Sequence, residues 1–600
     1  MTHHSKFALV VALAVCLLVS PSLAAKKQGY VSLRGFDKFV TKIIQEWEVP
    51  GVAIALVKDG RVLLAKGYGL RNVEKNLPVT GSTLFAIGSC TKAFTATAIG
   101  ILVDDGKLAW DKPVRNYLLD FKLQDPVATS EMTAVDLMCH RSGLPRHDFS
   151  WYGADASRRE LYERLRHLEP TEPFRYTFQY NNLMFMTAGI LVEKISGKKW
   201  EAFITERLFE PLGMTGSNFS VEESKKGDDF SLSYSKKNEK ITAIPFRNID
   251  AIAPAGAINS SAVDMAKWLQ LNLKKGKWGE KQIIKEATLQ FIHTPHMVTG
   301  GTYNKKVEFL YNTYGLGWGL GSYRGAPVVS HGGGIDGFIS TVALMPRQNA
   351  GLVVLTNNSS TGGYVTTIIG RHLYDRILGQ KPVDWNSQMK EQRDKAKAEE
   401  EKAKKEKKSK QVPGTSPSHP LGEYCGRFNN PGYGIVTVKE SDGNLGFVFN
   451  RIDYSAVHYH YDTFKITAWI DEDLSYLASF TPDPAGGAIQ SLSIPLQNGV
   501  KDIVFTRMAA EKMRDPKFLG QFVGEYKMNE MVVAISLTGD ILKATVPGQP
   551  VYVLEPIKGT EFALKKLTGY SVEFIKDKEG RVIEIKIHQP DGVYTAKKIK

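Results

Sequence analysis

Apolar and polar residues follow two different periods in the first two-thirds of the chain. Two β-rich runs, residues 52–57 and 62–65, flank an Asp59-Gly60 turn and predict a β-hairpin. Strand patterns return only at residues 339–345 and 351–356. Apolar residues that recur every three to four positions predict helices at residues 36–47, 91–103, 158–168, 183–195, 200–208, 262–274 and 364–378.

Strands therefore stand at both ends of residues 28–385, and helices fill the middle. This order predicts an α+β domain in which both ends of the segment build one antiparallel sheet and a helical lobe is inserted between them.

The composition changes at residues 386–420, which we interpret as a linker. Residues 389–410 are almost all Lys, Glu, Ala, Asp and Arg, and this pattern predicts a solvated helix. A Pro- and Ser-rich stretch follows from Val412 and is typical of a spacer. A functional basic tail is the alternative, and a linker is favoured over it.

The remainder of the chain is β-rich and repeats itself. The run Leu421-Gly422-Glu423-Tyr424 is echoed by Leu519-Gly520-Gln521-Phe522, which predicts modules at residues 421–508 and 515–600. Short alternating strands separated by Asp-Gly turns predict two small barrels or sandwiches, or one barrel shared by both copies.

The N-terminus has the pattern of a secretory signal over residues 1–25. Its apolar run, residues 7–19, is shorter than the ~20 residues that span a bilayer, and no later segment is long and apolar enough. We therefore expect an exported protein, periplasmic or extracellular, with no transmembrane segment. Lipidation at Cys16 is a minor alternative, because Val15 is not the small residue such a site usually has.

Length, composition and charge narrow the classes of protein. Six hundred residues predict two to four domains, and 42% hydrophobic residues indicate a folded chain. The net charge is +14, but the lysines are scattered and no nucleic-acid motif occurs, so a nucleic-acid partner is not expected. Cys90, Cys139 and Cys425 are too few for a disulfide framework. His458 and His460 lack a third ligand, and we expect neither a metal nor a cofactor.

The strongest candidate for chemistry is Ser89, with Lys92 three residues later at the start of a predicted helix. This spacing puts the two side chains in contact, and a lysine that has lost its charge can take the proton of a serine. The same spacing also occurs at Ser196, Ser233 and Ser387, so the motif alone is weak. Cys90 could itself be the nucleophile, but we favour a small buried residue there.

Two further motifs each occur once in the chain. They are Tyr180-Asn181-Asn182 and His331-Gly332-Gly333, the second followed by Gly334. With Ser89 and Lys92, the sequence here resembles the serine β-lactamase and penicillin-binding-protein superfamily, on its class C, D,D-peptidase and D-aminopeptidase side. The likeness covers about residues 30–380 and includes the runs 49–52, 65–69, 140–145, 314–319 and 331–338. The β-rich tail more weakly resembles the lipocalin-like modules appended to some members.

The resemblance implies a role for each motif residue. Ser89 would form an acyl-enzyme, while Lys92 and Tyr180 transfer protons, with Tyr180 as a phenolate whose pKa nearby Lys92 lowers. Asn182 would hold Lys92 and the substrate amide. The backbone N–H groups of Ser89 and Gly334 would form the oxyanion hole. The strand with His331, Gly333 and Gly334 would bind substrate, and we expect His140 to be structural.

One departure from the family bears on the substrate. Relatives that hold a free carboxylate tend to have a threonine where this chain has Gly332, and His331 is at best partly charged near neutral pH. We therefore expect weak carboxylate recognition, which favours an ester, an amide or a D-amino-acid-type peptide that bears its amine.

Two rival functions stay open. One is a class C-like β-lactamase, and the other is a catalytically inactive binding protein that uses its β-rich modules. Those modules would restrict substrate size or dock to the cell surface. The partner we expect is a small-molecule or peptide substrate.

Overall fold

The computed structural model describes residues 31–600 except 238, 301–307, 409, 470, 485–486 and 568. The predicted secretory signal thus lies outside the described residues.

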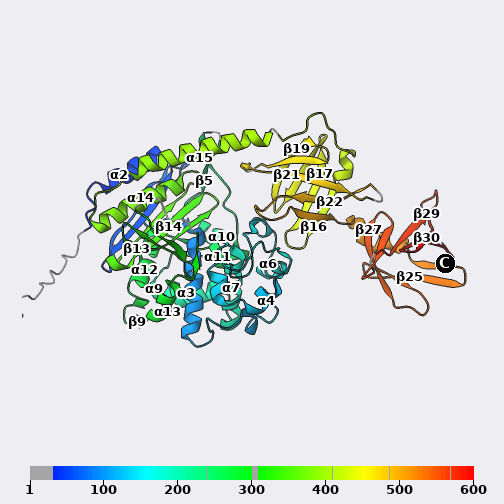
Figure 1. Cartoon of the computed structure of the whole chain (residues 1–600), viewed down its shortest axis with the longest axis horizontal. Coiled ribbons are helices and arrows are strands. Elements are labelled where there is room, and N and C mark those ends of the chain that lie inside the picture. The colour runs from blue at the N-terminus through cyan, green and yellow to red at the C-terminus, as the bar shows by residue number, and fades with distance from the viewer. Residues whose placement is uncertain are drawn as a thin grey trace, which may run out of the picture.

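A nine-stranded antiparallel sheet organises the first domain, as predicted (Figure 1). Its centre joins the two ends of the segment, because β1 (Gly51–Lys58) pairs with both β2 (Arg61–Asn72) and β15 (Ala350–Thr356). The sheet order is β10-β11-β12-β13-β14-β15-β1-β2-β3. The other strands are β3 (Leu77–Pro78), β10 (Met297–Val298), β11 (Asn312–Tyr314), β12 (Gly319–Tyr323), β13 (Ala326–Ile335) and β14 (Phe338–Met345).

Both faces of the sheet are covered, and alternate residues of β1 enter two separate cores. Val52, Ile54 and Leu56 pack with α2 (Phe36–Glu46) and α14 (Gly362–Leu378). The intervening alanines of β1 face α3 (Thr91–Asp104) and α12 (Ala262–Leu273). Burial on both faces explains why β1 is an unbroken apolar run rather than an alternating one.

The helical lobe lies between β3 and β10 in the chain. Its central helix is α7 (Asn182–Ser196), which packs against α3. The other helices are α4 (Pro126–Glu131), α5 (Ala134–Met138), α6 (Arg158–Arg164), α8 (Trp200–Ile204), α9 (Glu210–Leu212), α10 (Val221–Lys225), α11 (Ala253–Gly256) and α13 (Glu286–Ile292). Three short strand pairs complete it: β4 (Phe85–Ala86) with β7 (Asn259–Ser260), β5 (Tyr234–Lys237) with β6 (Lys240–Ala243), and β8 (Lys277–Trp278) with β9 (Lys281–Gln282).

The C-terminal third forms two closed eight-stranded barrels rather than one shared barrel. The sequence repeat corresponds to the start of each barrel, where Tyr424 and Phe522, the fourth residues of the two repeated runs, are both fully buried. The first barrel contains β16 (Gly426–Asn430), β17 (Gly434–Ser441), β18 (Asn444–Phe449), β19 (Ile452–His460), β20 (Thr463–Ala468), β21 (Asp471–Pro482), β22 (Ile489–Ile494) and β23 (Ile503–Arg507). The second contains β24 (Gly524–Met528), β25 (Met531–Thr538), β26 (Ile541–Thr545), β27 (Tyr552–Lys558), β28 (Glu561–Leu564), β29 (Ser571–Lys576), β30 (Val582–Gln589) and β31 (Gly592–Lys598). Short helices α16 (Leu421–Tyr424) and α17 (Pro516–Gly520) precede them.

The charged segment is helical, as its composition predicts. Figure 1 shows α15 (Trp385–Lys408) running across the first domain toward the first barrel, with the second barrel beyond it. Trp385 and Met389 anchor the start of α15 in the core beside α14. Within the described ranges, no helix combines the length and apolarity needed to cross a bilayer.

Candidate active site

Ser89 lies in a tight turn between a strand and a helix. The 3-10 turn η1 (Gly88–Cys90) follows β4 and leads directly into α3. Gly88 has φ +50°, and a Cβ there would stand 2.7 Å from the backbone nitrogen of Gly334. Only glycine allows both this conformation and this approach, so the chain brings Ser89 against β13.

Lys92 is fully buried and faces Ser89. Its Nζ lies 2.9 Å from Ser89 Oγ, 2.7 Å from Asn182 Oδ1 and 2.8 Å from the carbonyl oxygen of Ala255. Burial, helped by the positive charge of Arg146, lowers the pKa of Lys92 well below its usual value. A neutral amine has two N–H donors for the two carbonyl-type oxygens and a lone pair for the serine hydroxyl. Lys92 is therefore placed to accept the proton of Ser89.

Tyr180 and Asn182 come from the start of α7. The side chain of Asn181 caps this helix by accepting a hydrogen bond from the backbone N–H of Met184, which leaves its neighbours facing Ser89. The Tyr180 hydroxyl hydrogen-bonds to Ser89, and burial raises the pKa of Tyr180 above its usual value. The expectation of a phenolate is therefore wrong: the low-dielectric surroundings disfavour that charge, and Lys92 is the group that loses its own.

His140 supports Tyr180 from behind, as the expectation of a structural role requires. Its ring lies 4.2 Å from that of Tyr180, centroid to centroid. Nδ1 accepts a hydrogen bond from the backbone N–H of Asn181, and the carbonyl oxygen accepts one from that of Gln179. These two bonds fix the backbone on both sides of Tyr180.

β13 supplies the third wall of the site. A Cβ on Gly333 would lie 2.0 Å from the carbonyl oxygen of Ile87, so only glycine lets this strand approach the serine turn so closely. His331 is buried between the Tyr314 hydroxyl at 2.7 Å and the carbonyl oxygen of Gly332 at 2.5 Å. Burial lowers the pKa of His331 to about 3. This agrees with the expectation that His331 is at best partly charged near neutral pH, because desolvation disfavours the charged form of its ring.

Cys90 is not a competing nucleophile. Its Sγ faces the carbonyl oxygen of His331 and Ser340 Oγ, both at 3.3 Å, away from Ser89. Burial raises the pKa of Cys90 to about 11, which suppresses the thiolate.

Sequence reasoning missed Asp148, which organises the open side of the site. Its Oδ1 accepts hydrogen bonds from Asn182 Nδ2 and Trp151 Nε1, both at 3.0 Å. Its Oδ2 accepts one from Arg146 Nε at 2.5 Å. Asn182 is thereby held with its oxygen toward Lys92. The only sign in the sequence that these residues belong to the site is their place in the chain. Arg146 and Asp148 come just after the run 140–145, which carries the family resemblance.

The segment with Asp148 is tied to the sheet as well as to the lobe. The Tyr152 hydroxyl donates to Asp336 Oδ1 at 2.5 Å, just beyond β13. Asp336 Oδ2 also accepts the backbone N–H of Arg247 at 2.8 Å. One short stretch of chain, residues 148–152, therefore links the helical lobe and the sheet next to the candidate site.

The first barrel packs on the outer side of this same stretch. Tyr433 of the barrel hydrogen-bonds to His147 Nδ1 at 2.7 Å, and Asn450 Nδ2 donates to the carbonyl oxygen of Phe149 at 2.6 Å. Gln497 Oε1 accepts the backbone N–H of His147 at 2.9 Å. The barrel thus fixes residues that flank Asp148.

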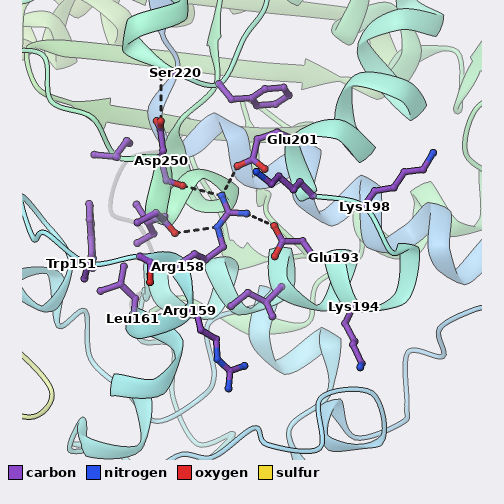
Figure 2. A pocket seen from close by; sticks show the side chains of 18 of the residues that line it. Trp151, Arg158, Arg159, Leu161, Glu193, Lys194, Lys198, Glu201, Ser220 and Asp250 are labelled. Carbon is purple, nitrogen blue, oxygen red and sulfur yellow. Dashed lines mark hydrogen bonds and ion pairs between the residues drawn. The ribbon is translucent and has the colours of Figure 1, made fainter. Parts of the chain in front are cut away.

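A hollow of about 1860 Å³ lies on the helical lobe next to these elements (Figure 2). Arg158 crosses it and donates to Glu193 Oε1 at 2.5 Å, to Glu201 and to the carbonyl oxygen of Asp250 at 2.9 Å. These bonds join α6, α7 and α8 to the segment that leads to Ala255. The carbonyl oxygen of Ala255, at the end of that segment, is the one that accepts a hydrogen bond from Lys92.

His458 and His460, which we did not expect to hold a metal, both make hydrogen bonds with the backbone. His458 Nε2 hydrogen-bonds to the carbonyl oxygen of Tyr461, and His460 Nδ1 accepts the backbone N–H of Val412. In the described part of the chain, no three His, Cys, Asp or Glu side chains group as metal ligands.

The fold and this cluster define the class of protein. A buried lysine, a tyrosine and an asparagine around one serine, between an antiparallel sheet and a helical lobe, constitute the site of a β-lactamase-fold serine hydrolase.

Comparisons with known proteins agree with this class. The family model described as Beta-lactamase matches residues 36–372, and one described as Domain of unknown function (DUF3471) matches residues 410–507, which span the first barrel. The chain belongs to the β-lactamase family.

Relatives cover most of the chain. The Unguisins hydrolase ungD' of Aspergillus campestris (strain IBT 28561) is 32% identical over 420 residues, which is 67% of this chain and 77% of that protein. Protein flp of Staphylococcus aureus (strain N315) is 28% identical over 360 residues, or 58% of this chain and 67% of that protein. The octameric penicillin-binding protein homologue from Pyrococcus abyssi has a TM-score of 0.52 at 22% identity, covering 87% of this chain and 100% of its own, and shares the fold.

Proposed function

We propose that this protein is an exported serine hydrolase that cleaves amide, peptide or ester bonds through an acyl-enzyme on Ser89. The observation that carries the proposal is the Lys92 amine, which lies 2.9 Å from Ser89 Oγ and whose burial lowers its pKa well below the usual value. A relative 32% identical to this chain bears the name of a hydrolase, which supports hydrolysis as the reaction.

Acylation uses Lys92 as the base. Ser89 Oγ transfers its proton to Nζ as the oxygen attacks the carbonyl carbon of the substrate. The negative charge that develops on the carbonyl oxygen meets the backbone N–H groups of Ser89 and Gly334, which close approach of β13 to the serine turn sets side by side. The protonated amine keeps two acceptors, Asn182 Oδ1 and the Ala255 carbonyl oxygen.

Departure of the leaving group uses Tyr180 as the acid. Its neutral phenol, hydrogen-bonded to Ser89, donates a proton to the leaving nitrogen or oxygen as the tetrahedral intermediate collapses. The proton held by Lys92 then restores the phenol. Water then attacks the acyl carbon and gives a proton to the same neutral amine. Lys92 passes that proton to Ser89 Oγ as the acyl–oxygen bond breaks, which releases the acid and restores the serine hydroxyl.

Covalent labelling tests the proposal. A fluorophosphonate probe should label the purified protein at Ser89, and Ser89→Ala should abolish labelling. Cys90→Ala is the matched control, because the neighbouring thiol points away from the site, and it should keep the label. Wild-type protein that takes no label, and that turns over neither D-amino-acid amides nor short-chain esters, would be the binding protein rather than an enzyme.

Rapid hydrolysis of nitrocefin by the same preparation would instead favour a β-lactamase. Export has its own test. N-terminal sequencing of protein recovered outside the cytoplasm should begin just after residue 24 or 25.

A further inference from the structure

Arg146 is the cation that stands beside the catalytic cluster. Its guanidinium carbon lies 5.0 Å from the centroid of the Tyr180 ring, the ring that Lys92 Nζ approaches to 4.8 Å. The Arg146 side chain is 49% exposed, whereas Lys92 is fully buried. The positively charged guanidinium of Arg146 therefore lies between the Tyr180 ring and solvent.

The hydrogen bonds of Arg146 leave one edge of the guanidinium open. Only Nε donates to a protein acceptor, Asp148 Oδ2, and neither Nη1 nor Nη2 donates to any of the residues that the structure describes. Asp148 in turn is held by Asn182 and Trp151. The ring of Tyr180 and the carboxylate of Asp148 thus fix the guanidinium while its two terminal nitrogens remain available. Such a fork matches the two oxygens of a carboxylate.

The alternative ligand, a substrate ammonium on Asp148, fits less well. Both oxygens of that carboxylate already accept hydrogen bonds, two on Oδ1 and one on Oδ2. An ammonium would also have to stand next to the Arg146 charge. Of the ion pair, Arg146 is more exposed than Asp148, so the positive group faces solvent.

The other groups around the nucleophile carry no opposing charge. Burial favours the neutral forms of Lys92, Tyr180 and His331. The expectation of weak carboxylate recognition considered only β13, where His331 is indeed neutral. The positive group, Arg146, belongs to another element, the segment that follows α5.

We propose that Arg146 binds a carboxylate of the substrate through Nη1 and Nη2, and so makes this site selective for anionic esters, amides or peptides. The inference rests on the proposed hydrolase function. Asp148 is the positioning residue that orients the guanidinium and ties it to Asn182.

Matched substrates test the proposal. One pair carries the charge on the acyl half: mono-p-nitrophenyl glutarate and its methyl ester. The other carries it on the leaving half: an ester of 3-hydroxybenzoate and the same ester of 3-hydroxybenzamide. Wild-type kcat/KM should favour the acid in at least one pair by about 10- to 100-fold, as expected for a charge-assisted bidentate contact.

Variants assign that preference to its residue. Arg146→Gln should remove most of the acid-over-neutral ratio, and Arg146→Lys should restore part of it, because charge returns without the fork. Arg159→Gln is the matched control, since Arg159 is a similarly exposed arginine of the lobe whose partners are Asp120 and Glu163. Its ratio should equal that of the wild type.

The outcomes separate this inference from the proposed function. A wild-type enzyme that labels at Ser89 but shows no acid preference in either pair overturns the role of Arg146 alone. The same holds if Arg146→Gln lowers kcat/KM for acid and neutral substrates equally. If Arg146→Gln does not fold, the wild-type ratio of kcat/KM for acid over neutral substrate is measured at rising salt concentration. A ratio that declines with salt supports a charge contact, and a ratio unaffected by salt overturns it. Absence of Ser89 labelling in the wild type would instead remove the hydrolase function itself.

Discussion

The charge state of Lys92 has a measurable effect on stability. In the unfolded chain a lysine holds its proton up to a pH of about 10.4. In the folded protein, burial lowers the pKa of Lys92 well below its usual value of 10.5. Between these two pKa values the unfolded state binds one proton more than the native state. The free energy of unfolding therefore rises with pH by about 1.4 kcal/mol per unit, and this contribution is lost as the pH falls.

Lys92→Met removes this dependence and keeps the volume. The stability of the variant relative to wild type should fall as the pH rises from 7 to 9, by up to about 1.4 kcal/mol per pH unit while the pH lies between the two pKa values of Lys92. The hydrogen bonds that Lys92 makes to Asn182 and Ala255 are also lost, but their cost is independent of pH. The slope, not the offset, reports the protonation of Lys92.

Urea unfolding followed by tryptophan fluorescence at pH 7, 8 and 9 measures the slope. Every tryptophan except Trp469 precedes residue 386, so the signal reports mainly on the first domain. Ser89→Ala keeps Lys92 and should retain the wild-type slope. A constant difference between Lys92→Met and wild type across this range would mean that native Lys92 is protonated. The assignment of Lys92 as the base would then fail.

Three further predictions follow from the site and its supports. Asp136 is fully buried and forms ion pairs with Arg141 and Arg175. Asp136→Ala should therefore lower the free energy of unfolding by about 3–5 kcal/mol in the same urea assay. A loss below about 1 kcal/mol would show that these ion pairs contribute little to stability. His331→Gln should leave the acid limb of the pH profile of kcat/KM where it is, because the pKa of His331 is already lowered to about 3; a moved limb would show that His331 titrates. Tyr433→Phe removes the hydrogen bond from the first barrel to His147 and should lower kcat several-fold in a p-nitrophenyl ester assay. The control Tyr461→Phe, at an exposed position, should keep the wild-type kcat. Equal kcat values for wild type and both variants would show that the barrel does not support the site.

Local sequence patterns were enough to predict most elements. The helices at 36–47, 91–103 and 262–274 and the strands around 52–57 and 351–356 form where the apolar periods place them. Backbone hydrogen bonding and burial of one face act over a few residues, and a short window of sequence contains both. The antiparallel sheet built from both ends, and the β-rich tail, follow from the order of those elements.

The charge states around the nucleophile could not be predicted in the same way. The family resemblance implied a Tyr180 phenolate, but burial raises the pKa of Tyr180 above its usual value. For His331 the sequence set only an upper limit on the charge, and burial lowers its pKa to about 3. A pKa depends on how many groups from distant segments exclude water from a side chain, and residue types alone do not contain that number.

By itself, then, the sequence pointed to Ser89, Lys92, Tyr180 and Asn182 as the residues of one candidate site, and it determined the succession of a mixed domain and a repeated β module. Only the tertiary structure decided that Asp148 holds Asn182, that Arg146 stands over Tyr180, and that the first barrel contacts the segment between them. The physical reason is that these contacts join residues far apart in the chain through single hydrogen bonds and ring contacts. Such contacts leave no period or spacing in the sequence.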